Sequence, residues 1–389
     1  NIRGRALLTG QTLQLMTGYF ATCARGLETV LARELAALGA DAVEPGRGGA
    51  GFRGHNSILY RANLWLRTAV RVLRPVLEIE VQSPDELYDA VRTVNWAEYL
   101  TSDHTLAVDC NVRDSAITHS QYAARRVKDA ICDQFRERTG LRPSVDPEQP
   151  MVGFNLHIHR DHAILSLDSS WGSLHKRGYR PIQTIAPLNE ALAAGLLMHG
   201  KWEPSTPLVD PLCGSGTFCI EGAWMALNRP PGLTRKWFGF QGWPEFDRPL
   251  WNAIRDEARL GVRKDLPAPI HGSDIHPGAI ELARTNAKSA GVGHLIQLNR
   301  LDVTNARPPA GPPGVMIVNP PYGERIGEER EWAGLYAKLG DVVGKNWKGW
   351  RLLVFTSNDW LARKIRLPLR GKTPFFNGKL QCQLWEFGS

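Results

Sequence analysis

The sequence of 389 residues lacks the patterns that mark several common protein classes. Its six cysteines are scattered and none belongs to a CxxC pair, so the sequence predicts neither a zinc site nor a disulfide framework. No apolar run approaches the ~18 residues of a membrane span, and the first residues lack the long apolar core of a signal peptide. Internal repeats and low-complexity tracts are missing too. We therefore expect a globular, cytoplasmic protein without a metal or a membrane partner.

What the sequence does have is an excess of positive charge. Lys and Arg number 47 against 39 Asp and Glu, which gives a formal net charge of +8. This balance favours a polyanionic partner such as nucleic acid. At roughly 150 residues per domain, the length predicts two or three domains.

The first folded unit is expected over residues 18–82. Residues 1–17 continue no later pattern, and we interpret them as a leader or as residues added upstream of the protein. A short strand from Tyr19 precedes a helix that Gly39 ends. The apolar positions of this helix recur at three- and four-residue steps: Leu27, Val30, Leu31 and Leu35. The pattern predicts a small α+β unit.

A second unit is expected over residues 83–172. The stretch "SQYAARRVKDAICDQFRERTG" predicts an amphipathic helix, and two strands joined near Arg160 and Asp161 follow it. The inner stripe of the helix is Ala124, Val127, Ile131 and Phe135. Its outer face carries Arg125, Arg126 and Lys128. These cations are candidates for contacts with RNA phosphates, with an ordinary solvated face as the alternative.

A basic connector, residues 173–188, leads into a C-terminal domain over residues 189–389. The stretch "LHKRGYRP" holds three more candidates for RNA binding: Lys176, Arg177 and Arg180. Beyond it strands and helices alternate, which predicts a parallel sheet covered by helices. Asn377-Gly378 predicts a closing hairpin, so the last strand would run antiparallel, as in methyltransferases and unlike dehydrogenases.

An insertion over residues 229–265 is rich in Trp and Phe, and one helix is expected around "PLWNAIRDEAR". Its rings are Trp237, Phe238, Phe240, Trp243 and Phe246. They would either stack on RNA bases or, as we expect, be buried against the sheet of the C-terminal domain.

The stretch "PLVDPLCGSGTFCIEGAWMAL" runs from a strand through a glycine turn into a helix. Gly214 and Gly216 allow the backbone to approach a ligand, and the helix start offers unpaired N–H groups. Cys219 occupies the place of a dinucleotide fingerprint's third glycine, and no lysine follows Gly216 as a phosphate loop requires. The loop suits a ligand without a pyrophosphate. S-adenosylmethionine fits, with its carboxylate near the helix start and its ammonium near Asp210, although a purely structural turn remains the alternative.

Two further acids follow predicted strands. Asp274 is placed to accept both ribose hydroxyls, although it lies 64 residues after Asp210 instead of the usual ~20, and the aromatic insertion accounts for the difference. Asp302 is suited to the adenine amino group. Each acid alone could be a helix cap. Three acids at successive strand ends on one sheet edge indicate a cofactor site.

The stretch "VNPPYGER" follows the predicted strand 315–318. Pro320 and Pro321 stiffen the backbone, so that the Asn319 amide oxygen and the Pro320 carbonyl point at one spot. An exocyclic amine on a base offers two donors and fits between these acceptors, while Tyr322 stacks on the base. Accepting both hydrogens would align the nitrogen lone pair for methyl transfer. The alternative is a plain Pro-Pro turn.

These motifs resemble those of class I S-adenosylmethionine-dependent RNA methyltransferases that act on an exocyclic nitrogen. The stretch "FATCARGLETVLARELAALGA" resembles the ferredoxin-like unit of THUMP-containing methyltransferases, and "SQYAARRVKDAICDQFRERTG" with "LHKRGYR" resembles the THUMP domain and its exit. The stretches "APLNEALAAGLL" and "FFNGKLQCQLWEF" are similar to pieces of bacterial 23S ribosomal RNA guanine-N2 methyltransferases. The likeness covers nearly the whole chain from Tyr19.

The resemblance implies an α/β fold: a Rossmann-like, seven-stranded methyltransferase sheet with an antiparallel last strand, preceded by a ferredoxin-like unit and a THUMP domain. It implies methylation of the N2 amine of a guanosine in 23S ribosomal RNA, free or in a pre-ribosomal particle. Some relatives carry a second methyltransferase domain behind the first, whereas this sequence stops at the hairpin, so a single modification is expected. The alternatives are a tRNA guanosine, a DNA adenine, or an inactive RNA-binding or ribosome-assembly factor.

The resemblance also implies a role for each matching residue. Residues 210–217 are expected at the methionine portion of the cofactor, Asp274 at the ribose, and Asp302 at the adenine. The residues expected to bind the cofactor are Asp210, Cys213, Gly214, Ser215, Gly216, Thr217, Asp274, Ile275, Asp302, Val303 and Asn319. The catalytic residues expected at the target base are Asn319, Pro320, Pro321 and Tyr322.

Overall fold

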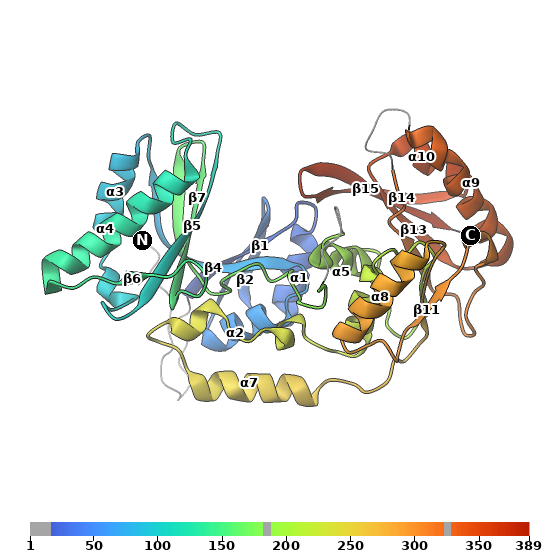
Figure 1. Cartoon of the computed structure of the whole chain (residues 1–389), viewed down its shortest axis with the longest axis horizontal. Coiled ribbons are helices and arrows are strands. Elements are labelled where there is room, and N and C mark those ends of the chain that lie inside the picture. The colour runs from blue at the N-terminus through green and yellow to red at the C-terminus, as the bar shows by residue number, and fades with distance from the viewer. Residues whose placement is uncertain (1–16, 182–187, 323–327, 389) are drawn as a thin grey trace.

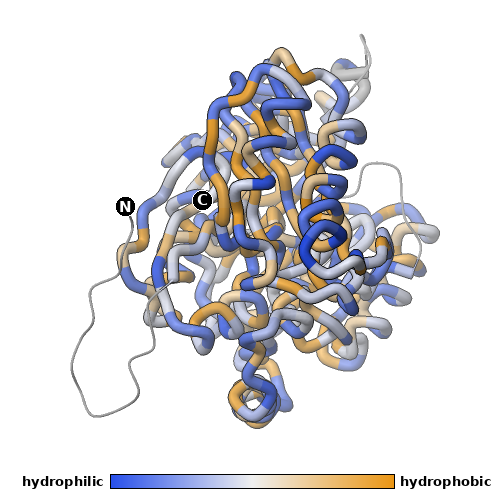
Figure 2. Tube along the Cα trace, turned by 90° about the vertical axis from the view of Figure 1, so that its left-hand side faces the viewer, coloured by the Kyte–Doolittle hydropathy of each residue, from blue (hydrophilic) through white to orange (hydrophobic). Residues whose placement is uncertain are grey.

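The computed structural model describes residues 17–181, 188–322 and 328–388, which form two β-sheets flanked by helices and set side by side along the long axis (Figure 1). Three predicted features fall wholly or partly outside these ranges: the leader before Thr17, the connector after residue 181, and the end of "VNPPYGER" after Tyr322. Hydrophobic residues concentrate along the strands, whereas the outer helices are largely hydrophilic (Figure 2).

The N-terminal half is built on an eight-stranded sheet of order β2-β3-β1-β4-β8-β7-β5-β6. Its strands are β1 (Thr17–Cys23), β2 (Asp41–Gly46), β3 (Gly49–Gly54), β4 (Ala69–Glu80), β5 (Thr105–Arg113), β6 (Ser144–Val145), β7 (Val152–His159) and β8 (His162–Asp168). Its helices are α1 (Glu28–Ala37), α2 (Asn56–Trp65), α3 (Pro84–Arg92) and α4 (Ser120–Thr139). The antiparallel pairing of β4 with β8 makes one continuous sheet across the predicted boundary between residues 82 and 83.

Local sequence explains most of these elements. The predicted apolar stripe of α1 is buried, and Gly39 follows the helix with a φ of +81°. Arg160 and Asp161 both have positive φ, as a tight hairpin turn requires, and they join β7 to β8 as predicted. In α4 the stripe is shifted slightly, because Ala123 is buried whereas Ala124 is only half-buried.

The C-terminal half is built on a seven-stranded sheet of order β11-β10-β9-β12-β13-β15-β14. Its strands are β9 (Leu208–Asp210), β10 (Ile270–Asp274), β11 (Gln297–Arg300), β12 (Val315–Val318), β13 (Arg351–Thr356), β14 (Leu369–Asn377) and β15 (Leu380–Gly388). Its longer helices are α5 (Glu190–His199), α6 (Thr217–Ala226), α7 (Arg248–Leu260), α8 (Pro277–Ser289) and α9 (Glu328–Asn346), and a short α10 is Asp359–Ala362.

The strand directions of this sheet agree with the prediction. Strands β9 to β13 are parallel, and β15 runs antiparallel to both β13 and β14. The two residues that connect β14 to β15 are Gly378 and Lys379, one position beyond the predicted Asn-Gly turn. The strand order reverses at β9, which has β10 on one side and β12 on the other, and such a switch point is where α/β sheets bind ligands.

The aromatic insertion does not pack as predicted. Phe238, Phe240 and Trp243 are buried, and the Phe240 amide donates to the Ser169 carbonyl of the N-terminal half at 3.0 Å, whereas Trp237 is exposed. The ring of Phe240 stacks on Tyr60 of α2 with 4.5 Å between centroids, and the Tyr60 hydroxyl accepts a hydrogen bond from the Asp247 amide at 2.9 Å. Helix α7 therefore lies alongside α2 (Figure 1). The insertion joins the two halves of the protein.

Candidate active site

Four predicted site residues meet at the carboxyl edge of the C-terminal sheet. Asp210 and Asp274 are the last residues of β9 and β10, Asp302 lies two residues after β11, and Asn319 directly follows β12. Strands β9, β10 and β12 are hydrogen-bonded neighbours in parallel register, and neighbouring strands lie about 4.8 Å apart. The topology therefore places the glycine loop and the Asn-Pro-Pro-Tyr corner side by side.

The glycine loop is bound to the end of β10. The Gly214 amide donates to Asp274 Oδ2 at 3.1 Å, and the Cys213 amide donates to the Ser273 carbonyl at 2.9 Å. Gly214 and Gly216 have φ of +50° and +80°, a region that disfavours side chains. A Cβ on Gly216 would also lie 3.1 Å from the Cβ of Ala283. The loop conformation therefore depends on glycine.

Asp210 is a buried carboxyl group. Its side chain accepts a hydrogen bond from the Leu212 amide at 3.1 Å. Burial raises the pKa of Asp210 well above its ordinary value, and the nearby charge of Asp274 raises it further. An ammonium group beside Asp210 would offset the cost of ionising it. The residue therefore fits the amino group of an amino-acid-like ligand.

The first turn of α6 is held by residues that the sequence patterns did not single out. Among the described residues no side chain caps this helix at Gly216, so its first N–H groups remain available to an anion. The Asn286 amide donates to the Ser215 carbonyl at 2.9 Å, and Arg180 Nη2 donates to Thr217 Oγ1 at 2.5 Å. Their distance along the chain explains why no local pattern revealed them.

Asp302 acts as a local cap, which is the alternative to cofactor binding that the sequence left open for each acid. Its Oδ1 accepts hydrogen bonds from the amide and the hydroxyl of Thr304 at 2.8 and 2.7 Å, and these bonds lower the pKa of the carboxyl group. The predicted neighbours differ in exposure: Val303 is buried, whereas Ile275 is 48% exposed at the sheet edge. An exposed isoleucine there leaves an apolar surface at the sheet edge.

The Asn-Pro-Pro-Tyr corner leaves one buried acceptor without a partner. Asn319 Oδ1 is buried and has no hydrogen bond among the described residues. The carbonyls of Pro321 and Tyr322 are occupied: Pro321 O accepts from the Tyr336 hydroxyl at 3.2 Å, and Tyr322 O accepts from Asn358 Nδ2 at 3.4 Å. A buried acceptor without a partner is available to a donor on a bound ligand.

Tyr336 and Asn358, which hold the corner, were missed in the sequence. Both contact the Thr356 hydroxyl at the end of β13, with Tyr336 Oη and the Asn358 amide each 3.1 Å away. Because β13 is the parallel neighbour of β12, these contacts tie the corner to the adjacent strand. Pro320 is buried, Pro321 is exposed and Tyr322 is half-buried.

The predicted RNA contacts on α4 lie at the surface. Arg125 is exposed, Arg126 bonds Asp85 at 2.7 Å and lies over the Tyr88 ring, and Lys128 lies 2.6 Å from Asp129. Exposed ion pairs of this kind are weak and do not prevent a phosphate contact.

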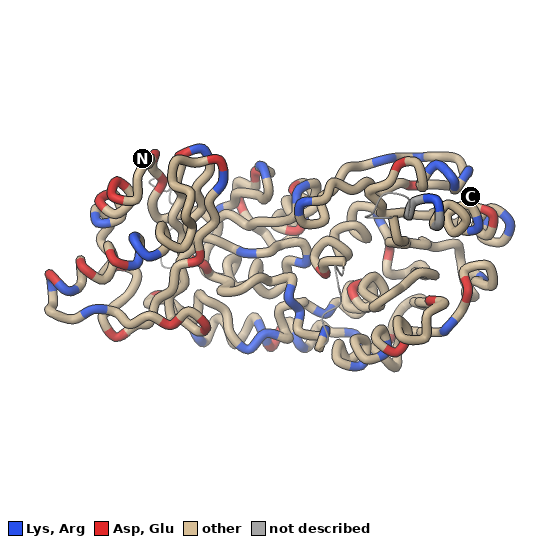
Figure 3. The backbone as a smooth tube through the Cα atoms, turned by 45° about the horizontal axis from the view of Figure 1, so that its top comes forward, with Lys and Arg blue, Asp and Glu red and all other residues tan. Residues whose placement is uncertain are grey.

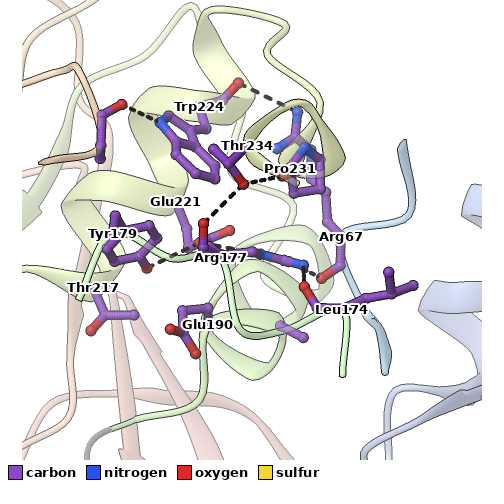
Figure 4. Close-up of polar contacts among 12 residues, drawn as sticks. Arg67, Leu174, Arg177, Tyr179, Glu190, Thr217, Glu221, Trp224, Pro231 and Thr234 are labelled. Atoms are coloured by element: carbon purple, nitrogen blue, oxygen red, sulfur yellow. Dashed lines mark hydrogen bonds and ion pairs between the residues drawn. The ribbon is translucent and has the colours of Figure 1, made fainter. Parts of the chain in front are cut away.

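The prediction for Arg177 is wrong, because its guanidinium is buried in the junction between the two halves (Figure 4). It donates to the carbonyls of Leu174 and Arg67 at 2.6 and 2.5 Å, and its Nε lies 3.7 Å from Glu221 Oε1. The Tyr179 hydroxyl donates to the same Glu221 oxygen at 3.1 Å. Arg177 has a structural role. Of the connector cations, only Lys176 is exposed.

Within the described ranges, no helix is both long and apolar enough to cross a membrane. The same ranges hold no group of three or more His, Cys, Asp or Glu side chains that could bind a metal ion.

A seven-stranded sheet with this order, a reversed last strand and a glycine loop after the strand at the switch point, β9, defines a class I methyltransferase. Comparison with known families gives three matches: an RlmL ferredoxin-like domain at residues 18–73, a THUMP domain at residues 81–168, and an RMKL-like methyltransferase domain at residues 177–386. The chain belongs to the THUMP-containing class I S-adenosylmethionine-dependent RNA methyltransferases.

Individual relatives agree with this assignment. The chain is 43% identical over 369 residues to a putative RNA methyltransferase, slr0064, of Synechocystis sp., covering 95% of this chain and 96% of the relative. It is 45% identical over 380 residues to the ribosomal RNA large subunit methyltransferase K/L of Syntrophotalea carbinolica, covering 95% of this chain and 53% of the relative. This chain thus spans about half the length of that K/L relative.

A solved structure shares the fold over nearly the whole chain. The putative methyltransferase SMU.472, determined in complex with SAH, superposes with a TM-score of 0.87 at 30% identity and covers 96% of this chain and 98% of its own.

Proposed function

We propose that this protein methylates the exocyclic N2 amine of a specific guanosine in 23S ribosomal RNA, in the cytoplasm. The observation that carries the proposal is the buried, unpartnered Asn319 Oδ1 next to the glycine loop. A guanine N2 amine offers two N–H donors, and Asn319 Oδ1 with the Pro320 carbonyl would accept them. The names of the K/L relatives support the large-subunit RNA as substrate.

The cofactor site is proposed as the sequence patterns predict it. Asp210 would hold the ammonium group, the first turn of α6 the carboxylate, and Asp274 the ribose hydroxyls. Ile275, Asp302 and Val303 would surround the adenine. Bound there, S-adenosylmethionine supplies an electrophilic methyl group.

The corner would activate the amine by orientation. The nitrogen of a guanine amine is a poor nucleophile because its lone pair is delocalised into the ring. Two acceptors at Asn319 and Pro320 favour a more tetrahedral nitrogen with its lone pair free, and Tyr322 stacks on the base. No covalent intermediate with the protein is required, and the proton can leave to water.

RNA binding is proposed for the THUMP half. Arg125, Arg126, Lys128 and the connector residue Lys176 remain the proposed phosphate contacts, because all four lie at or near the surface. Such contacts would give an affinity that falls steeply with salt.

The test is to incubate the purified protein with labelled S-adenosylmethionine and unmodified 23S ribosomal RNA, and then to digest the RNA to nucleosides. We expect label in N2-methylguanosine at one position. Parallel reactions with unmodified tRNA and with DNA test the alternative substrates. Label only in tRNA guanosine, only in DNA adenine, or in no nucleoside would overturn the proposal.

A further inference from the structure

The surface next to the proposed base-binding corner begins at Asn358. Asn358 Nδ2 donates to the Tyr322 carbonyl at 3.4 Å, and its Oδ1 accepts from the Leu361 amide at 3.1 Å, which caps α10. Helix α10 is thereby anchored to the corner. Its second residue, Trp360, is 46% exposed.

The chain around this tryptophan is strongly basic. Residues 359–379 contain six Lys and Arg and a single acid, Asp359. That acid is already bound by Lys372 Nζ at 2.5 Å. In the described part of the chain no carboxylate lies within salt-bridge distance of Arg363 or Lys364. Lys and Arg are spread over both halves of the molecule, and several lie near the C-terminal end (Figure 3).

Three of these side chains share one face. Trp360, Arg363 and Lys364 stand three and four residues apart on the continuous turns of α10 and the following 3₁₀ helix, so they project from the same side. Lys364 Nζ lies 4.2 Å from the centre of the Trp360 ring. We call this set the Trp360 surface.

Local packing does not explain the exposed ring. The core beneath α10 is closed by Leu361, Ala362 and Ile365, which are all buried. The Trp360 ring therefore lies outside this core and, together with Lys364, is accessible to a partner. Aromatic rings next to cations are the usual combination for unpaired nucleic acid, because bases stack on the ring and phosphates pair with the cations.

We propose that the Trp360 surface binds single-stranded RNA adjoining the nucleotide held in the corner. This inference rests on the proposed function in taking RNA as the substrate. A base flanking the target would stack on Trp360, while Arg363 and Lys364 would pair with the backbone phosphates. The excess of cations favours a polyanion over a protein partner.

The test measures RNA binding directly, without methyl transfer. The probe is a short fluorescent oligouridylate that carries one guanosine, and anisotropy gives its affinity at several salt concentrations. We expect Trp360→Ala to lower the affinity about tenfold, because it removes the ring on which one base stacks. Trp360→Phe should retain most of the affinity, because it keeps an aromatic ring. In the double variant Arg363→Glu with Lys364→Glu, the slope of log affinity against log salt should fall by about 1.4, which corresponds to two lost phosphate contacts.

Matched controls lie elsewhere on the surface. Leu260 and Lys264 are also exposed, on the insertion that packs against the N-terminal half. The variants Lys264→Glu and Leu260→Ala should leave RNA affinity unchanged. SAH affinity, measured for every variant, reports an intact C-terminal domain and should not change.

Several results would overturn the inference. One is an unchanged RNA affinity in Trp360→Ala, and another is an equal loss in Leu260→Ala. Normal binding of free RNA with lost binding to ribosomal particles would indicate a protein partner instead. The proposed reaction can fail separately. If the wild type forms no N2-methylguanosine but Trp360→Ala still loses RNA affinity, the RNA-binding role of the Trp360 surface is supported and the proposed methylation is rejected.

Discussion

The guanidinium of Arg180 donates a hydrogen bond to the hydroxyl of Thr217 at 2.5 Å. The same side chain donates to the Leu188 carbonyl at 2.7 Å and lies 3.6 Å from Glu190. One arginine of the connector thus binds the first turn of α6 and the start of α5. The predicted RNA contact therefore faces the glycine loop, and we infer that it positions Thr217 for the methionine end of the cofactor.

Replacing Arg180 should weaken the cofactor site without affecting RNA binding. We expect Arg180→Gln to lower SAH affinity about tenfold, because a charge-assisted hydrogen bond at Thr217 is lost. 5′-Methylthioadenosine has no carboxylate or ammonium group, so its affinity should change little. Isothermal calorimetry with both ligands separates an effect at the methionine end from a general loss of structure.

Arg235 provides the control for Arg180. It is a half-buried arginine that bonds backbone carbonyls, including those of Ser173 and Trp171, away from the glycine loop. Arg235→Gln should leave both affinities unchanged. If Arg180→Gln instead lost RNA affinity and kept SAH affinity, the assignment of Arg180 to RNA would be restored.

Two substitutions at the Asn-Pro-Pro-Tyr corner should lower methyl-transfer activity to different extents. Asn319→Ala removes the unpartnered acceptor, and we expect methyl transfer to fall at least 100-fold, a loss of the size seen when one transition-state hydrogen bond is removed. Tyr336→Phe frees the Pro321 carbonyl and should lower kcat about tenfold, since the corner keeps its acceptors but loses rigidity. Tyr336→Phe should not change SAH affinity in calorimetry, because Tyr336 is not among the proposed cofactor-binding residues. Full turnover in Asn319→Ala would favour an inactive factor with a contaminating activity.

Asp210 should make the ligand-free protein less stable as pH rises. Its folded-state pKa is raised above the ordinary 3.8, so the folded protein favours the protonated form, and stability is lost as pH climbs through the raised value. Asp210→Asn should remove this pH dependence and raise the Tm at neutral pH. Thermal unfolding of both proteins over a pH series checks the sign. A wild-type Tm that rose through the same range would contradict it.

Gly216 should tolerate no side chain. Its φ of +80° and the close approach of Ala283 both oppose a Cβ, so Gly216→Ala should cost about 1–2 kcal/mol of unfolding free energy and weaken SAH binding. Gly278 in the first turn of α8 has open space around it, and Gly278→Ala should be neutral or slightly stabilising. Denaturant unfolding compares the two. Equal effects would show that the loop does not require glycine.

The insertion shows where sequence patterns mislead. Its composition predicts burial, and Phe238, Phe240 and Trp243 are buried whereas Trp237 is exposed, but the receiving surface is Tyr60 and α2. The hydrophobic effect favours burial of a ring but is not directional, so a sequence does not show which apolar surface the ring packs against. The eight-stranded sheet is a similar case, because the pairing of β4 with β8 joins segments that the sequence presents as separate units.

The sequence by itself determined the order of strands and helices, the glycine turn, the acids at the strand ends and the prolyl corner. These follow from local periodicity and backbone chemistry, and parallel strands must bring their carboxyl ends to one edge. Only the tertiary structure decided that Arg177 is buried, that Arg180 faces Thr217, and that Tyr336 and Asn358 hold the corner. The local sequence around an arginine does not show whether its guanidinium is solvated or bonded to a buried carbonyl. The Arg67 carbonyl that Arg177 binds lies 110 residues away along the chain, where no local pattern can indicate it.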